Sequence, residues 1–261
     1  MLPSAGRIAC SRCFASEATF NRSVEERDGW RITNNPLAWG SREPKVIVLG
    51  FSKGPNQIQK LLYSHHNDIA YAGSRKNVGK ILAGVGLLSE APDNSSVISH
   101  LIAEREGPYH FGSLVRCTVE RREGDVWKGS GGGMLDKFVA TPFGDRITKN
   151  CCDEFLKEVK APLVVMFGLG TGLNYVRSCK KLFEAVLGGS WRSINEVAYT
   201  NGAINVVHVE HFASQGSLIP EWLGERGTDR HRYCTQARTA VKTALSEADL
   251  ASLRDYASRF A

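Results

Sequence analysis

The hydrophobic positions along the chain form short continuous runs that alternate with helical patterns. Four runs have the length of a buried strand, at residues 46–50, 109–115, 163–167 and 204–209. Apolar residues recur at helical spacing over residues 77–88, 147–159, 173–187, 230–245 and 247–260. Strands that alternate with helices are typical of β-α units and a parallel sheet. We therefore expect an α/β protein built on four mainly parallel strands.

Three segments lack periodicity and are expected to be loops, at residues 91–96, 121–134 and 188–201. The second is basic and contains Trp127, so it is either a solvated loop or an arm that contacts a nucleic-acid strand. Ligands of open parallel sheets bind beyond the carboxyl ends of the strands. We expect the functional residues near those ends, at Gly50, Cys117, Gly168 and His211.

The 261 residues suit a single domain. We expect residues 1–261 to form it, with the N-terminal segment 1–30 carrying a C-x-x-C pair and residues 230–261 as a helical extension. No apolar run approaches the roughly 20 residues of a membrane helix, and residues 1–9 lack a signal-peptide core. The formal charge of +6 favours a polyanionic partner. These features predict a cytoplasmic protein with no membrane partner.

Two turns follow predicted strands and carry candidate chemistry. Residues 50–57, Gly-Phe-Ser-Lys-Gly-Pro-Asn-Gln, let backbone N–H groups approach a ligand closely, or they form a tight turn only. His211 opens the second turn, where it can donate a hydrogen bond to an oxygen that gains negative charge. Its alternative role is to satisfy a loop carbonyl.

A third glycine-rich turn, residues 168–172, has the pattern G-x-G-x-G. A methyl-donor or dinucleotide site would add an acidic residue at the end of the next strand, roughly 20 residues on. Glu196 falls there, but in a predicted loop. We therefore favour a strand-to-helix turn, and an S-adenosylmethionine-dependent methyltransferase stays as an alternative.

Seven cysteines are present, and four stand where a metal site can form. Cys10 and Cys13 form the C-x-x-C in a polar stretch, Cys117 ends the second strand, and Cys152 lies in the helix before the third. Four thiolates hold an iron–sulfur cluster or zinc. The neighbouring Cys151 is the other candidate for the fourth position.

Taken in order, these motifs resemble the uracil-DNA glycosylase superfamily, particularly its iron–sulfur-containing, thermostable-type members. Those proteins open with C-x-x-C and continue with a strand that ends in a G-E-A-P-G-like loop, here residues 50–54. An aromatic-x-G segment follows at residues 71–73, with a helix that ends near residues 84–87. A T-N-x-V-K-C-like strand end, a C-x-x-x-L helix, an L-G strand end and an H-P-S-like turn complete the series, at residues 112–117, 152–156, 163–168 and 211–213.

The resemblance implies a three-layer α/β/α sandwich with a central, mainly parallel four-stranded sheet, and a role for each matching residue. The catalytic residues would be His211, Ser52 and Asn56. The flipped base would meet Gly50, Phe51, Tyr71 and Ser113, with Tyr71 as the first choice for stacking. The DNA backbone would contact Lys53, Gly54, Arg75 and Ser214. Cys10, Cys13, Cys117 and Cys152 would hold a four-iron four-sulfur cluster, or zinc instead.

The sequence also departs from the family pattern. Phe51 replaces the acidic residue of the first loop and Lys53 replaces its proline, Ser113 replaces the base-reading Asn, and Phe212 replaces the Pro after the His. The water-activating Asp or Asn would fall at Ser52. A divergent member with a broader or altered base range is therefore expected.

The implied function is that of a monofunctional DNA glycosylase in base excision repair. It would flip out uracil or another deaminated base and hydrolyse the N-glycosidic bond, leaving an abasic site. The partner would be damaged DNA, and the protein a bacterial, nucleoid-associated monomer. The non-enzymatic alternative is a damaged-base or single-strand DNA binder that has lost catalysis, because the acid of the first loop is missing.

Overall fold

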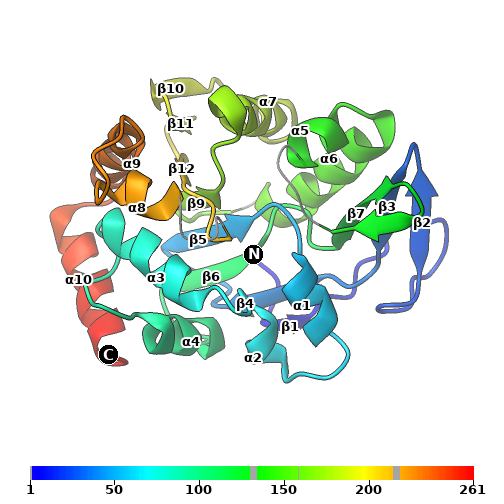
Figure 1. Ribbon diagram of the computed structural model, residues 1–261, viewed down its shortest axis with the longest axis horizontal. Coiled ribbons are helices and arrows are strands. Elements are labelled where there is room, and N and C mark those ends of the chain that lie inside the picture. Colours follow the sequence, from blue (N-terminus) through cyan, green and yellow to red (C-terminus); the bar gives the residue numbers. More distant parts are fainter. Residues whose placement is uncertain (1, 130–133, 158, 214–217) are drawn as a thin grey trace.

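The computed structural model describes residues 2–129, 134–157, 159–213 and 218–261 and has a mixed α/β architecture (Figure 1). Its large sheet has eight strands in the order β1-β4-β6-β5-β9-β12-β11-β10. The four central strands run parallel and coincide with the four predicted runs: β6 (Tyr109–Ser113), β5 (Val46–Gly50), β9 (Leu163–Phe167) and β12 (Asn205–Val209). The α/β prediction is confirmed in this respect.

Short antiparallel strands extend the sheet on both sides, so the prediction of four strands is wrong in number. They are β1 (Gly6–Arg7), β4 (Leu37–Gly40), β11 (Ala198–Thr200) and β10 (Arg192–Asn195). The predicted loop at 188–201 therefore contains two strands. Strands of two to four residues are too short to show a hydrophobic period.

A second sheet of four antiparallel strands stands beside the first, at the right of Figure 1. It consists of β2 (Val24–Arg27), β3 (Trp30–Thr33), β7 (Thr118–Glu123) and β8 (Val126–Lys128). The β7–β8 hairpin occupies much of the segment predicted as a loop at 121–134, which corrects that prediction. Most of its residues are charged or exposed, and this hid the strands in the sequence.

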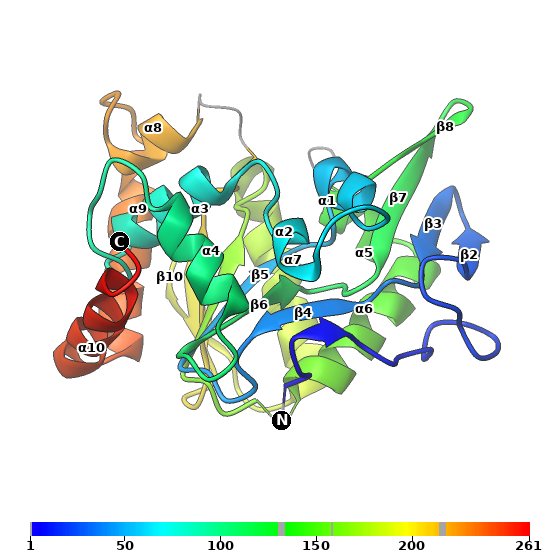
Figure 2. The same ribbon diagram turned by 90° about the horizontal axis from the view of Figure 1, so that it is seen from below.

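Helices flank both faces of the large sheet (Figures 1 and 2). On one face lie α3 (Arg75–Gly84), α4 (Ser95–Ala103), α8 (Leu218–Leu223), α9 (His231–Ala244) and α10 (Glu247–Ser258). The other face carries α5 (Met134–Val139), α6 (Pro142–Leu156) and α7 (Asn174–Leu187), the last preceded by a short 3₁₀ turn (Thr171–Leu173). Two further helices, α1 (Pro55–Lys60) and α2 (His66–Ile69), follow β5.

The predicted helices are confirmed, with two larger differences at their ends: α3 ends at Gly84 instead of continuing to residue 88, and α6 begins at Pro142 instead of residue 147. Helix α9 lies in the predicted C-terminal extension and packs directly on β12, with Ala237, Ala240 and Val241 buried.

No described helix has both the length and the apolar character needed to cross a bilayer.

Two clusters of buried apolar side chains hold the structure. The main cluster surrounds the large sheet, whose strands β5 and β9 are buried along their whole length. The second lies between the small sheet and helices α5 and α6, around Trp30, Phe138 and Phe143. Phe51, directly after β5, packs against both clusters. The loop that begins at Gly50 therefore starts where the two cores meet.

Candidate active site and thiol cluster

The carboxyl ends of the four parallel strands are level with one another. Gly50 of β5 is paired with Ser113 of β6, and Val209 of β12 is paired with Phe167 of β9. The Gly168 N–H extends the β9–β12 pairing by donating to the Val209 carbonyl over 2.9 Å. The segments after Gly50, Ser113, Gly168 and Val209 therefore leave the sheet along one edge.

The turn after β5 and the turn after β12 meet at this edge, although they are 161 positions apart in the sequence. The Phe212 ring lies 3.9 Å from the position that a side chain at Gly50 would occupy. The Asn77 side chain of α3 donates to the Phe212 carbonyl over 2.8 Å. The two turns therefore lie next to each other at this edge of the sheet.

His211 is half-buried in the second turn, with its two ring nitrogens in different situations. Its Nδ1 accepts a hydrogen bond from the backbone N–H of Ala213 over 3.2 Å. Burial lowers the pKa of His211 below its usual range, and the nearby Glu210 acts in the opposite direction. A neutral ring that accepts at Nδ1 carries its proton on Nε2. This tautomer makes Nε2 a hydrogen-bond donor without adding a positive charge.

Glu210 fixes the start of the same turn. Its carboxylate is buried, accepts from the His211 backbone N–H over 2.9 Å and pairs with Arg230 over 2.6 Å. A methyl-donor site would want an acidic residue at the end of the strand beside β9, and Glu210 stands there. Its carboxylate instead binds Arg230, and Glu196 lies in the turn between β10 and β11, bonded to Gln236.

The glycine-rich turn 168–172 is shaped by its own packing. A side chain at Gly170 would lie 2.2 Å from the Asn174 side chain and 2.7 Å from the Tyr175 backbone nitrogen, and the φ of Gly170 is +74°. These contacts explain its glycines as a strand-to-helix turn. They supply no feature that favours the methyltransferase alternative.

Tyr71 lies in the core below the two turns, only 4% exposed. Its ring meets Phe111, Phe167 and Phe212 edge-on, at centroid distances of 5.0–6.1 Å, and its hydroxyl donates to the Val48 carbonyl. In this position the ring offers no face to a flipped base, so the structure corrects our first choice of stacking residue. Phe51, the second choice, is half-exposed.

The other residues of the first loop differ in exposure. Ser52 and Gly54 are half-buried, while Asn56 is exposed at the start of α1 and lies beside Gly73. Gly54 caps α1, and its N–H donates to the Gln57 side chain over 3.2 Å. Ser113, at the end of β6, is buried next to Gly50. The loop thus presents Ser52 and Asn56 near the strand ends.

Two residues expected to contact the DNA backbone are directed into the protein. Lys53 is 1% exposed, and its amine donates to the Arg116 carbonyl. Arg75 uses its guanidinium within the fold, on the carbonyls of Asn67 and Ala70 and on the Ser99 hydroxyl. Both predictions of a phosphate contact are therefore corrected. Ser214 lies outside the described residues.

The structure gathers four thiols at the second core, and the fourth is Cys151. Cys13, Cys117 and Cys151 are buried in that cluster, with Cys10 packed against it. Cys152 points from α6 in a different direction, into the main core, where its thiol interacts with that of Cys179. The assignment of Cys152 to the ligand set is corrected to Cys151. We call Cys10, Cys13, Cys117 and Cys151 the thiol cluster.

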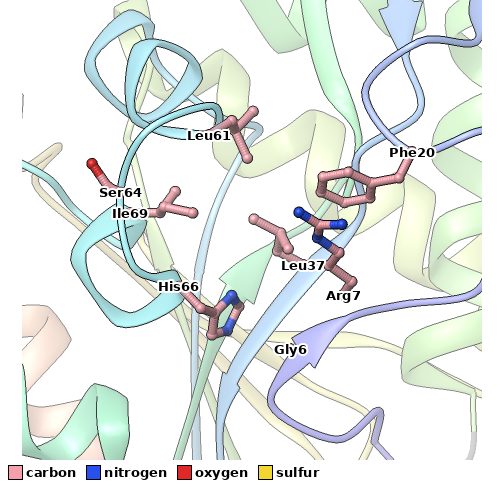
Figure 3. Close-up of a pocket in the computed structure, with 8 residues that line it drawn as sticks. All are labelled: Gly6, Arg7, Phe20, Leu37, Leu61, Ser64, His66 and Ile69. Carbon is pink, nitrogen blue, oxygen red and sulfur yellow. The ribbon is translucent and has the colours of Figure 1, made fainter.

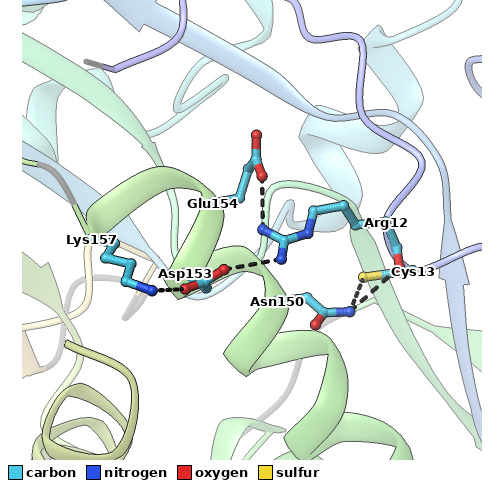
Figure 4. A network of polar contacts seen from close by, with 6 residues as sticks. All are labelled: Arg12, Cys13, Asn150, Asp153, Glu154 and Lys157. Carbon is cyan, nitrogen blue, oxygen red and sulfur yellow. Dashed lines mark hydrogen bonds and ion pairs between the residues drawn. The ribbon is translucent and has the colours of Figure 1, made fainter. Parts of the chain in front are cut away.

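The N-terminal C-x-x-C is tied to α6 by polar contacts (Figure 4). Arg12 pairs with Glu154 over 2.8 Å and with Asp153 over 3.0 Å, and Asp153 is also paired with Lys157. The Asn150 side chain donates to the Cys13 thiol over 3.7 Å. These contacts hold Cys10 and Cys13 against the helix that carries Cys151.

Each sulfur of the thiol cluster faces a hydrogen-bond donor. Burial raises the pKa of the Cys10 and Cys117 thiols, and the backbone N–H groups of Arg12 and Asn35 oppose this shift. A hydrogen bond with Cys151 lowers the pKa of Cys13 to about 7, and Asn150 acts in the same direction. The same hydrogen bond, together with burial, raises the pKa of Cys151, and the Arg116 N–H opposes this shift. Donors aimed at sulfur stabilise the thiolate form that binds metals.

Four cysteine thiols are the ligand set both of a four-iron four-sulfur cluster and of a single zinc ion. Among residues 2–129, 134–157, 159–213 and 218–261, no three His, Cys, Asp or Glu side chains form a group able to hold one metal ion. A single zinc requires four sulfurs at about 2.3 Å. Thiolates around a four-iron core stand further apart, because the inorganic core lies between them.

Two buried cations lie beside the thiol cluster, and the sequence analysis missed their positions. Burial lowers the pKa of Lys53 to about 8, whereas the Cys117 thiol acts to raise it. Arg116 is 1% exposed, with its guanidinium near His110 and the Leu37 carbonyl. Gly112 makes room for Arg116, because a side chain there would lie 1.9 Å from the guanidinium. Only the tertiary structure shows that these charges are turned inward.

A cavity of about 150 Å³ opens away from these residues, between β1, β4 and the α1–α2 segment (Figure 3). Leu37, Leu61, Ile69 and Phe20 give it an apolar wall, and Arg7 and His66 contribute its charged or titratable groups. None of its lining residues belongs to the predicted base site. We therefore place the candidate active site at the strand ends.

The sequence matches no protein-family model and no curated protein. The geometry of the strand ends and of the thiol cluster is therefore the basis on which a function can be argued.

Proposed function

We propose that the protein is a DNA glycosylase of the uracil-DNA glycosylase type, acting on uracil or another deaminated base. The observation that carries the proposal is the meeting of the Gly50 and His211 turns, with Phe212 next to Gly50 and the His211 Nδ1 atom accepting from the Ala213 N–H. In this proposal, the four parallel strands and the helices on their two faces are the three-layer sandwich of the family.

His211 has the chemistry that this reaction requires. When the glycosidic bond breaks, the base leaves as an anion, and negative charge gathers on the carbonyl oxygen beside the bond. A neutral Nε2–H donor stabilises that oxygen in the transition state. The Ala213 N–H donates a hydrogen bond to Nδ1, the other ring nitrogen of His211. This bond keeps the ring in its orientation while negative charge develops on the base. Backbone N–H groups of the Gly50 loop would assist.

Water must then attack the sugar cation, and the loop at 50–57 contains no carboxylate to activate it. Ser52 and Asn56 are the side chains of this loop that can position a water molecule. Phe51 is the proposed stacking ring, since it is half-exposed beside Gly50, while Tyr71 supports the Phe212 ring from below. Ser113 lies next to Gly50 and would meet the edge of the base.

DNA contacts are assigned to exposed residues near the same edge, because Lys53 and Arg75 are engaged elsewhere. Helix α1 starts from the Gly50 loop and ends at the exposed Lys60. Leu62 and Tyr63 follow and are 64% and 87% exposed. Figure 2 shows α1 on the same side of the molecule as the tip of the β7–β8 hairpin.

We further propose that the thiol cluster holds a four-iron four-sulfur cluster. Cys10 and Cys13 of the N-terminal segment, Cys117 directly before β7 and Cys151 of α6 would be its ligands. When bound, the cluster supplies cross-linking of these three segments and a local negative charge. Zinc is the alternative occupant, because four thiolates also bind a single zinc ion.

The test is single-turnover excision from oligonucleotides that carry uracil, hypoxanthine, xanthine or a thymine mismatch, read as alkali-labile sites. We expect His211→Ala to lower the rate constant by about 10²-fold or more, the scale of losing one oxyanion donor. His100→Ala, an exposed position on α4, is the control and should retain full activity. Equal rates in His211→Ala and the wild type would remove His211 from the mechanism.

The pH profile gives a second readout of the same role. Because burial lowers the pKa of His211 below 6.5, the neutral ring predominates at neutral pH. The rate constant should be independent of pH around neutrality and fall on acidification, as protonation of Nδ1 breaks the bond from Ala213. A rate that rises on acidification would point to a cationic histidine instead.

The missing carboxylate favours one second candidate, a damaged-base or single-strand DNA binder without catalysis. It predicts affinity for base-modified DNA in the absence of abasic sites. Stoichiometric binding with no base release from any of the four substrates would replace the enzymatic proposal with this one.

A further inference from the structure

The Lys53 side chain points into the protein, whereas the neighbouring residues of its loop are partly exposed to solvent. Phe51, Ser52 and Gly54 on either side are partly exposed, yet the Lys53 side chain is 1% exposed. Its amine reaches the carbonyl of Arg116, the residue that precedes Cys117. The side chain therefore runs from the proposed base-binding loop to the thiol cluster.

Arg116 is a second buried cation at the same place. Its guanidinium faces the Leu37 carbonyl over 3.4 Å and the His110 Nε2 atom over 3.2 Å, and both partners are uncharged or weakly basic. Within the described part of the chain, neither Lys53 nor Arg116 has a carboxylate at ion-pair distance, as the described ion pairs show. Buried charges are stable when an opposite charge lies nearby.

The groups that can supply this opposite charge are sulfurs. Lys53 interacts electrostatically with Cys117 and Cys151, and Arg116 interacts with Cys151. Four neutral thiols offer no counter-charge, whereas four thiolates on a four-iron four-sulfur core carry a net negative charge. The two cations and the cluster would then neutralise each other inside the second core.

We propose that Lys53 is a counter-cation of the iron–sulfur cluster and, as a positioning residue, fastens the base-binding loop to it. The inference rests on the proposed cluster but not on glycosylase activity. It also accounts for one departure from the family pattern, because Lys53 stands where the G-E-A-P-G-like loop has a proline, which could not make this contact. Arg116, which follows the end of the neighbouring strand β6, would supply the second positive charge beside the cluster.

A nearby positive charge favours the reduced cluster, because reduction adds a negative charge. Lys53→Met removes the charge and keeps a long unbranched side chain, so the reduction potential should shift to a more negative value. Lys53→Arg keeps the charge and should retain a potential close to that of the wild type. Lys60→Met removes an exposed lysine of the adjoining helix α1 and serves as the matched control.

The experiment is a potentiometric titration of the anaerobically purified full-length proteins, followed by visible absorption and electron paramagnetic resonance. Iron content and circular dichroism verify that each variant is loaded and folded. A negative shift confined to Lys53→Met supports the inference. Equal potentials in Lys53→Met and the wild type overturn it, as does a shift of the same size in Lys60→Met.

Loss of the cluster is also informative. If Lys53→Met folds without iron and Lys53→Arg regains it, the positive charge is needed for assembly, which supports the inference. If both variants fold without iron, the position acts through its shape, and the charge role is rejected. A wild-type protein that contains zinc or no metal rejects it too. None of these readouts involves DNA, so the inference can stand if base excision is absent, and can fail if excision is present.

Discussion

Neighbouring residues of the same type have different surroundings in this protein, and the difference sets their roles. Cys151 and Cys152 are consecutive on α6, where one residue turns the side chain by about 100°. Cys151 therefore faces Cys13 and Cys117, and Cys152 faces Cys179. Lys53 and Lys60 form a similar pair, since the first is buried against the thiols and the second is exposed.

The cysteine pair gives a prediction at the residue scale. Cys151→Ala should abolish cluster binding and the visible absorption at about 400 nm that cysteine-ligated iron shows. Cys152→Ala should keep the iron and lose only core packing, roughly 1 kcal/mol in the free energy of unfolding. Metal analysis and urea unfolding distinguish the two. Iron retained by Cys151→Ala and lost by Cys152→Ala would return the fourth position to Cys152.

At the scale of elements, the strand ends depend on close backbone approaches that only glycine permits. Gly40 ends β4 with a φ of +79°, and a side chain there would lie 2.3 Å from the Tyr109 carbonyl oxygen. This contact sets the distance between β4 and β6 and, through the register of β6 with β5, the alignment of Ser113 with Gly50.

Gly40→Ala should therefore destabilise the fold by more than about 3 kcal/mol, because the clash is with backbone and adds to the conformational strain. Gly189 is the control: its φ is +78° and nothing lies within 4 Å of the added carbon. Gly189→Ala should show the strain alone, about 1–2 kcal/mol. Urea denaturation measures both. Similar losses in the two variants would show that the clash at Gly40 is relieved by local adjustment.

Over the whole of the described structure, the large apolar side chains with the highest exposure lie in the segment that follows α1. Tyr63 is 87% exposed and Leu62 beside it is 64% exposed, directly after the helix that begins at the Gly50 loop. The formal charge of +6 adds a general attraction for a polyanion. A solvent-exposed aromatic ring beside a basic residue such as Lys60 is suited to stacking on an unpaired base.

Tyr63→Ala should weaken binding to single-stranded DNA by roughly ten-fold, the scale of losing one base–aromatic stack. Fluorescence anisotropy at two salt concentrations measures it, and the salt dependence should be unchanged because no phosphate contact is removed. Val24→Ala, an exposed apolar position on β2, is the control. Unchanged affinity in Tyr63→Ala would exclude this tip from the DNA surface.

The central strands were predictable because all four are continuous apolar runs, and the long helices because their apolar residues repeat at helical spacing. The edge strands and the small sheet could not be predicted, since strands such as β7 carry charged residues and expose part of their length. Of the site residues, His211 and the Gly50 loop could be placed from their positions after strands. The burial of Tyr71 and the direction of Lys53 could not.

The parallel centre of the sheet, the edge at which its strands end and the residues that follow them could all be inferred from the amino-acid order. These features depend on the local hydrophobic pattern of each segment. The three-dimensional packing was needed to show that Phe212 lies against Gly50, that Cys151 joins Cys13, and that Lys53 turns away from solvent toward the thiols. Such contacts depend on how distant segments pack, and the direction of a single side chain leaves no periodic signal in the sequence.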